Sequence, residues 1–174
     1  MSTIALTKTA NSDMALSSDA RAKMRHTEKE EYRYYNDMKK LGGNCTWGIG
    51  IKAHNGPCTG DELKKNVSAA QVEAAFSSKV AEAERGVRRR VTKKALTQPQ
   101  FDALVSLSYN LGINGSLNIF DLVDGGNQKA AGRLIASMIK ARVKGADGKT
   151  KFVVLKGLIV RRAGESAPFL SAEK

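Results

Sequence analysis

A strongly apolar segment that begins at a helix start signal constrains this fold more than any other part of the chain. Residues Thr97–Gln100 have the spacing of a capping box, and Pro99 is tolerated in the first helical turn. The apolar positions that follow are nearly continuous: Phe101, Leu104, Val105 and Leu107. Since a helix that is apolar on most sides must be covered on most sides, this segment predicts the central buried helix of a mostly helical protein.

Other patterns predict further helices. Ser68–Gln71 is a second capping-box pattern, and the apolar residues after it are spaced by three and four as far as Ala83. Ser18 or Asp19 predicts the start of a helix that runs toward Tyr34. Shorter helical patterns occupy residues 116–123, 128–141 and 158–165.

The remaining segments predict a minor β component. The β-prone run 45–51 lies in a stretch rich in glycine and asparagine, and an Asp-Gly step at 147–148 predicts a hairpin between Val143 and Phe152. We therefore expect an α+β protein, mostly α-helical, in which residues 1–174 form a single domain. Its expected parts are a loosely ordered N-terminus (1–17), a small β region (about 36–60) and a helical lobe (about 68–170).

The net charge of +12 narrows the classes of partner. Such a charge attracts polyanions, which include nucleic acid, anionic membranes and the acidic polymers of bacterial envelopes. The basic cluster Arg85–Arg90 is accompanied by no helix-turn-helix, zinc-knuckle or stacking motif, so no specific nucleic-acid partner is expected. No segment approaches the roughly 20 apolar residues of a membrane span, and residues 1–23 lack the pattern of a signal peptide.

The two cysteines, Cys45 and Cys58, admit two interpretations. In an oxidising compartment they could close a small hairpin, whereas in a cytosolic protein they would remain free thiols. The absence of a recognisable signal peptide favours the free thiols. The cysteines and the two histidines, His26 and His54, lack the spacing of a metal site, so neither metal nor cofactor is expected.

The segment 28–50 holds the candidate chemistry. Glu28 and Asp37 are carboxylates in different local settings, and Thr46 follows them at the start of a glycine-punctuated run. Glycosidic cleavage needs one carboxyl that stays protonated and a second that stays ionised. A charged helix face with no catalytic role is the alternative explanation, and Glu30 and Glu31 compete with Glu28 on the residues alone.

Three ordered segments resemble the phage-type lysozymes of glycoside hydrolase family 24. The first is the Glu28, Asp37, Thr46 series followed by Gly-Ile-Gly. The second is 97–112, similar to a central helix that ends in an aromatic-Asn-x-Gly turn, and the third is 157–165, which has the form GLxxRRxxE. Two departures are a longer loop between Asp37 and Thr46, and Ile51 in place of the histidine that usually follows Gly-x-Gly.

This resemblance implies a lysozyme-like, two-lobed fold and an N-acetylmuramidase that cleaves the β-1,4 bond between N-acetylmuramic acid and N-acetylglucosamine. It implies Glu28 as the general acid, Asp37 as the base and Thr46 as the residue that holds the water. The expected substrate-binding residues are Tyr35, Asn110, Arg161 and Arg162; Arg161 or Arg162 could instead cap the last helix, and Asn110 could be only a helix cap.

The same resemblance implies a monomeric bacteriolytic endolysin acting on peptidoglycan, without a separate wall-binding domain. It would be made in the host cytoplasm and reach the periplasmic wall after a holin opens the membrane. Two alternatives remain open. One is a lytic transglycosylase that cuts the same bond, and the other is a cationic protein that perturbs the anionic envelope without catalysis.

Overall fold

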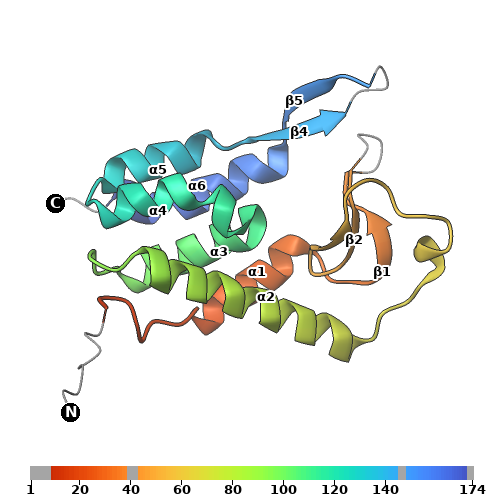
Figure 1. Ribbon diagram of the computed structural model, residues 1–174, viewed down its shortest axis with the longest axis horizontal. Coiled ribbons are helices and arrows are strands. Elements are labelled where there is room, and N and C mark those ends of the chain that lie inside the picture. Colours follow the sequence, from red (N-terminus) through yellow and green to blue (C-terminus); the bar gives the residue numbers. More distant parts are fainter. Residues whose placement is uncertain (1–8, 39–42, 145–147, 172–174) are drawn as a thin grey trace, which may run out of the picture. The chain divides into compact units, whose positions relative to one another are not determined.

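The computed structural model describes residues 9–38, 43–144 and 148–171. The chain divides into two compact units. Figure 1 labels most of the helices and strands. The first unit consists of the N-terminal segment to Ser17 together with Glu82–Ser137 and the chain from Arg161 onward; the second consists of Ser18–Ala81 and Met138–Val160. The helices are α1 (Ser18–Glu28), α2 (Ala69–Arg90), α3 (Gln98–Gly115), α4 (Leu117–Asp124), α5 (Gln128–Ser137), α6 (Lys156–Leu170) and the short 3-10 helix η2 (Glu62–Lys64).

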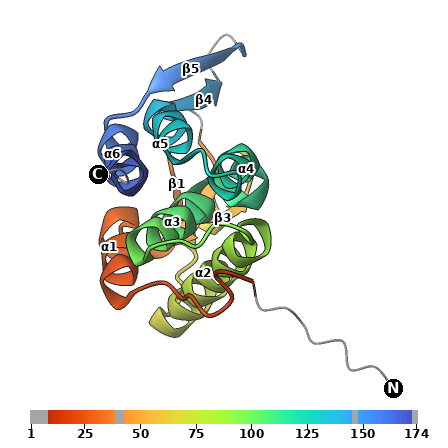
Figure 2. The same cartoon turned by 90° about the vertical axis from the view of Figure 1, so that its left-hand side faces the viewer.

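Helix α3 is the buried helix of the first unit, as the sequence predicted. Thr97 and Gln100 form both halves of a capping box, and the α3 side chains from Phe101 to Tyr109 are largely buried. Helices α2 and α3 approach closely at Gly86, where a Cβ would lie 2.0 Å from Ile113 Cδ1. Helices α4 and α5 pack against each other beside α3 (Figure 2). The predicted start of α2 is also confirmed: Gln71 N donates to Ser68 Oγ at 3.2 Å, and Ser68 N donates to Gln71 Oε1.

The N-terminal segment from residue 9 to residue 17 forms no helix or strand, but Asn11 anchors it within the first unit. The Asn11 amide donates to Val91 O at 2.8 Å and to Lys94 O at 2.9 Å, and its oxygen accepts from Leu96 N. Because Asn11 is only 1% exposed, its side chain depends on these internal hydrogen bonds to satisfy its polar atoms.

The second unit contains a three-stranded antiparallel sheet of β1 (Glu31–Asn36), β2 (Cys45–Gly48) and β3 (Ile51–His54). The prediction of a helix reaching Tyr34 is wrong, because α1 ends at Glu28 and residues 31–36 form a strand. Lys29 has φ 57°, a left-handed conformation that stops a helix. The following Tyr-Arg-Tyr-Tyr run has the aromatic content typical of strands.

A second, two-stranded sheet lies in the same unit. It consists of β4 (Lys140–Lys144) and β5 (Thr150–Val154), paired antiparallel with Arg142 opposite Phe152. The predicted hairpin is therefore confirmed, although its Asp147 lies outside the described residues. The helix predicted at 128–141 ends earlier, at Ser137, because the chain from Lys140 enters β4.

A disulfide joins Cys45 on β2 to Cys58, so the expectation of two free thiols is wrong. The spatial arrangement brings the two residues together: Asn36 Oδ1 accepts from Cys58 N at 2.7 Å, while Cys45 pairs with Asn36 across the strands. The bond therefore fastens the loop after β3 to the centre of the three-stranded sheet.

Candidate active site

Glu28 is the last residue of α1, and two arginines fix that helix on α2 within the second unit. The guanidinium groups of Arg21 and Arg25 lie 4.7 and 5.1 Å from the centre of the Phe76 ring. Arg21 also donates to Glu73 Oε1 at 2.9 Å and to Ser77 Oγ at 2.6 Å. Cation–π contacts and charged hydrogen bonds together hold the helix end that carries Glu28 in a defined place.

The half-buried Glu28 side chain lies against the turn between β2 and β3. A Cβ built on Gly50 would be 2.8 Å from Glu28 Oε2. Gly50 has φ +64°, which L side chains rarely adopt, and its carbonyl accepts from Lys79 Nζ at 3.3 Å. The glycine at position 50 thus makes room for the carboxylate, which explains why the sheet turn and Glu28 can approach each other.

Asp37 directly follows β1, and Asn44 fixes its position. The exposed Asp37 carboxylate accepts from Asn44 N at 2.7 Å through Oδ1, while Asp37 N donates to Asn44 O at 3.1 Å. A Cβ on Gly43 would lie 2.0 Å from Asp37 Oδ1, so only glycine fits there. A carboxylate has acceptor sites beyond the one that Asn44 occupies.

Thr46 is brought to the same place by the register of the sheet. It pairs with Tyr35 across β1 and β2, it is 4% exposed, and its Oγ1 donates to Asn44 O at 3.3 Å. Asn44 O therefore accepts from both Asp37 and Thr46. The two candidate residues thus share one backbone acceptor.

Tyr35 experiences the charge of both carboxylates. Burial, followed by the negative charges of Glu28, Asp37 and Glu31, raises the pKa of Tyr35 to about 12. Because the negative charges of Glu28 and Asp37 both raise the pKa of Tyr35, its phenol lies within electrostatic range of both carboxylates. The adjacent Tyr34 stacks on Trp47, with ring centroids 6.1 Å apart.

Glu30 and Glu31 lie beyond the end of α1, so they no longer compete with Glu28 as residues of one helix. Glu30 accepts from Arg25 Nη1 at 3.1 Å, and Glu31 Oε1 is 3.2 Å from Lys29 Nζ. His54 is the last residue of β3.

The first unit contains a separate buried polar network around Arg162 of α6. Its guanidinium donates to Glu165 Oε2 and, at 2.6 Å, to Asn110 Oδ1, while Ser106 Oγ donates to Glu165 Oε1 at 2.6 Å. Arg162 and Glu165 are 1% and 5% exposed. Arg162 and Asn110, both predicted as substrate-binding residues, are thus bonded to each other, whereas Arg161 is half-buried on the same helix.

A family model described as phage lysozyme matches residues 25–165, which includes both the Glu28–Thr46 region and the Arg162–Glu165 helix. The chain belongs to the phage lysozyme family. It is accordingly a glycoside hydrolase of the lysozyme type, with the α+β, mostly helical fold that the sequence predicted.

Solved structures agree with this membership. The lysozyme is similar to an endolysin from the Escherichia coli O157:H7 phage FAHEc1, with 27% identity, a TM-score of 0.70, and coverage of 92% of this chain and 96% of that one. It is also similar to the muramidase domain of SpmX from Asticaccaulis excentricus, with 26% identity, a TM-score of 0.64 and coverage of 90% and 97%. A P22 lysozyme mutant shares the fold at 24% identity, with a TM-score of 0.59 and coverage of 91% and 99%. Comparison with the curated proteins finds no match.

Sequence reasoning missed three residues that shape this site in the lysozyme: Gly43, Asn44 and Gly50. Asn44 acts through its backbone, which no side-chain pattern reveals, and the two glycines serve by lacking a Cβ. The frequent glycines of the 28–50 segment were the sequence feature that indicated such close contacts. Among the described residues, no helix is long and apolar enough to cross a membrane.

Proposed function

We propose that this phage lysozyme hydrolyses the β-1,4 bond between N-acetylmuramic acid and N-acetylglucosamine in peptidoglycan. The observation that carries the proposal is the placement of two carboxylates around the three-stranded sheet: the half-buried Glu28 lies against the Gly50 turn, and the exposed Asp37 is held by Asn44 N. Two carboxylates in unequal solvation, near each other in one compact unit, are what glycoside hydrolysis requires.

In the proposed reaction Glu28 is the general acid and Asp37 the general base. Glu28 gives its proton to the glycosidic oxygen as the bond from that oxygen to the anomeric carbon of the muramic acid breaks. Asp37 takes a proton from a water molecule whose oxygen forms the new bond to that carbon. Attack from the opposite face inverts the anomeric carbon, and this route requires carboxyl groups about 6.5–9.5 Å apart.

Thr46 is proposed to hold the attacking water. Its hydroxyl is bonded to the same Asn44 carbonyl that accepts from Asp37 N, so hydroxyl and carboxylate share one rigid support. Tyr35, Asn110, Arg161 and Arg162 are proposed as substrate-binding residues. For Asn110, whose side chain is exposed, the support is the hydrogen bond from Arg162 that fixes it; Arg162 is 1% exposed and would act by holding Asn110.

A lytic transglycosylase remains the alternative chemistry, because it needs the acid but no base for water: a hydroxyl of the muramic acid attacks intramolecularly. Mass spectrometry of purified peptidoglycan digested by the wild type, Glu28→Gln and Asp37→Asn distinguishes the two. Hydrolysis predicts reducing muropeptides from the wild type and their loss in both variants. Anhydro products that persist in Asp37→Asn would establish the transglycosylase.

Matched controls keep this test specific. Glu30→Gln changes a neighbouring exposed carboxylate that is paired with Arg25, and Asp61→Asn changes an acid that lies outside the candidate site. Both controls are expected to retain the wild-type product pattern. Proton NMR of the first product gives its anomeric configuration, and a retained configuration would contradict the role of Asp37 as base.

Host cell lysis is the proposed setting, because a similar solved protein is named an endolysin. We propose that the enzyme is a monomer made in the host cytoplasm and that it reaches the wall after a holin permeabilises the membrane. Expressing the chain in bacteria with and without a separately encoded holin tests this dependence, since lysis is expected with the holin and absent without it.

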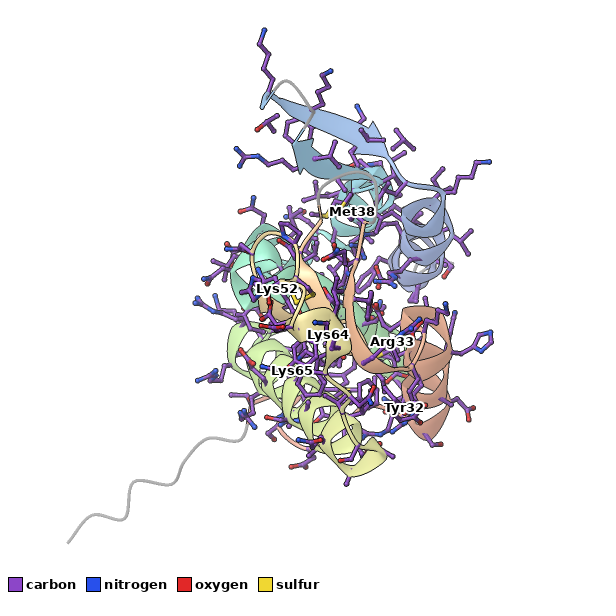
Figure 3. The ribbon with its side chains drawn as sticks, turned by 90° about the vertical axis from the view of Figure 1, so that its right-hand side faces the viewer. Tyr32, Arg33, Met38, Lys52, Lys64 and Lys65 are labelled. Carbon is purple, nitrogen blue, oxygen red and sulfur yellow. A yellow bond between two sulfur atoms is a disulfide. The ribbon has the colours of Figure 1, made fainter. Side chains whose placement is uncertain are left out.

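Contact with the anionic envelope is proposed for the β4–β5 hairpin of the second unit. One of its faces pairs Lys140 with Val154 and Arg142 with Phe152; all four side chains are exposed, and Phe152 is 71% exposed. Cationic and apolar groups on one face suit a surface of anionic lipid. On the three-stranded side of the same unit, Figure 3 shows further exposed basic side chains: Arg33, Lys52, Lys64 and Lys65. The exposed face of the β4–β5 hairpin is the feature that favours envelope perturbation as a second function. That activity would survive Glu28→Gln.

A further inference from the structure

A cluster of metal-ligating side chains surrounds the disulfide of the second unit. Cys45, His54 and Glu62 each offer one ligand atom, and these three atoms lie within 4.8 Å of one another. Cys58 Sγ is bonded to Cys45 Sγ. The spacing in sequence gave no indication of a metal site, but the fold brings two sulfurs, one imidazole and one carboxylate to one point. This cluster is independent of the carboxylates proposed for catalysis.

The backbone holds the donors of this cluster in place. Cys45 and His54 are direct partners across β2 and β3, so their side chains share one face of the sheet. Cys58 is fixed by its N–H bond to Asn36 Oδ1 at 2.7 Å. Glu62 begins η2, and its Oε2 accepts from Thr59 N at 2.8 Å and from Thr59 Oγ1 at 3.0 Å. The cluster is therefore preorganised on regular elements and a capped turn.

His54 holds Glu62 in the cluster through an ion pair. Its Nδ1 is 3.0 Å from Asn55 O, and because a carbonyl only accepts, Nδ1 must carry a hydrogen. Its Nε2 is 3.0 and 3.1 Å from the two carboxylate oxygens of Glu62, which also only accept, so the imidazolium donates from both ring nitrogens. A Zn²⁺ bound at Nε2 would take the place of the Nε2 proton. An Nδ1–H bonded to a backbone carbonyl is also the usual support for a histidine that ligates metal through Nε2.

We propose that, when the Cys45–Cys58 disulfide is reduced, Cys45, Cys58, His54 and Glu62 bind one Zn²⁺. Two molecules of a small-molecule thiol transfer two electrons to the disulfide and become a disulfide themselves, which leaves two protein thiols. Zn²⁺ then displaces the two thiol protons and the proton on His54 Nε2, which pass to solvent, and gains two thiolates, one imidazole and one carboxylate. Tetrahedral Zn²⁺ takes this donor set, with Zn–S bonds of about 2.3 Å.

The oxidised protein offers a much poorer site. Its sulfurs carry no negative charge, so His54 and Glu62 are the strong donors that remain in the cluster. Disulfide and zinc are consequently alternative cross-links at the same position, one for an oxidising and one for a thiol-rich compartment. In either state the loop that contains Cys58 stays fastened to β2, next to Asn44 and Thr46.

The experiment measures Zn²⁺ binding by the full chain in a phosphine reductant that does not chelate zinc, by competition with a chromophoric chelator. One equivalent is expected to bind to the reduced protein, and binding to the oxidised protein is expected to be at least about tenfold weaker. His54→Ala and Glu62→Ala should each weaken binding at least about tenfold, since even groups that only support a ligand change zinc affinity by 10–100-fold. The control His26→Ala, an exposed histidine on α1, should bind like the wild type.

A second readout guards against variants that fail to fold. Saturating Zn²⁺ should raise the melting temperature of the reduced wild type and of His26→Ala, because a ligand that binds only the folded chain stabilises it. Cobalt substitution should produce a thiolate-to-metal absorption band in the reduced wild type. The proposal is overturned if Zn²⁺ leaves the wild-type melting temperature unchanged, or if folded His54→Ala and Glu62→Ala bind zinc as tightly as the wild type.

Discussion

Gly50 and Glu28 are in such close proximity that a single methyl group on the glycine would reach within 2.8 Å of Glu28 Oε2. We predict that Gly50→Ala lowers kcat on peptidoglycan at least tenfold, which corresponds to about 1.4 kcal/mol of transition-state stabilisation. The displaced carboxylate would no longer point its proton at the substrate oxygen. Turnover of dye-labelled peptidoglycan measures the effect.

Gly56→Ala is the matched control for this substitution. Gly56 also has a positive φ, +84°, but a Cβ there would meet nothing within 4 Å. Both variants should lose about 1–2 kcal/mol of unfolding free energy from left-handed strain. Equal activity losses in the two variants would mean that strain, and not Glu28, accounts for the effect.

Arg162→Met tests the buried network of the first unit. The substitution leaves the Glu165 carboxylate buried without its guanidinium partner, and breaking such a pair typically costs about 3–5 kcal/mol. Urea unfolding should show this loss, whereas Arg133→Met on the exposed face of α5 should stay within about 0.5 kcal/mol of the wild type. Adding Glu165→Gln to Arg162→Met should restore part of the stability, because the uncompensated charge is removed. A double variant as unstable as the sum of the two single variants would argue against direct coupling.

Local patterns predicted the helical part of this fold well. The starts of α2 and α3 and the β4–β5 hairpin depend on residues a few positions apart, and each was identified before the structure. The end of α1 was missed because Glu28–Tyr35 has the charge pattern of a helix, while the pairing of Tyr35 with Thr46 that makes it a strand is set by a distant segment.

For the candidate site, the sequence indicated side chains with suitable chemistry but not the groups that hold them in place. Glu28, Asp37 and Thr46 carry recognisable chemistry, and the register places Thr46 opposite the residue two before Asp37. Asn44 holds Asp37 and Thr46 through its carbonyl, an atom that every residue has. The state of the cysteines could not be predicted either, because it depends on how the fold brings Cys58, in the loop after β3, next to Cys45 on β2.

Asp124 should make the stability of the first unit depend on pH. Burial raises the pKa of its carboxyl, but the N–H groups of Lys93, Lys94 and Thr92 donate to it and outweigh burial, so the pKa is lowered overall. All three bonds end on Oδ1, at 2.7–3.2 Å. Because the folded pKa lies below the unfolded value of about 3.9, the stabilisation is present above that value and is lost as pH falls through the folded pKa.

Two substitutions separate the charge of Asp124 from its geometry. Asp124→Asn keeps an oxygen acceptor without the charge, and Asp124→Ala removes both. At neutral pH we expect Asp124→Ala to cost about 1–2 kcal/mol, as for the loss of a helix cap, and Asp124→Asn to cost less. Urea unfolding at neutral pH and below pH of about 3 should show the gap between wild type and Asp124→Asn closing in acid. A gap that is constant across this range would rule out the ionised carboxylate as its source.

Phe152 and Arg142, opposite each other on the β4–β5 hairpin, should contribute to envelope binding in different ways. Transfer of a phenylalanine side chain out of water is worth about 1.5–3 kcal/mol, and a basic residue near an anionic bilayer about 1 kcal/mol. Phe152→Ser should therefore weaken binding to vesicles of anionic lipid about tenfold or more at any salt concentration. Arg142→Gln should weaken it about fivefold, and only at low salt, because added ions screen the attraction. Leu63→Ser, which changes an apolar side chain of 45% exposure on η2, is the control and should bind like the wild type. If the control loses as much affinity as Phe152→Ser, or if neutral vesicles bind as well as anionic ones, the hairpin is not the contact surface.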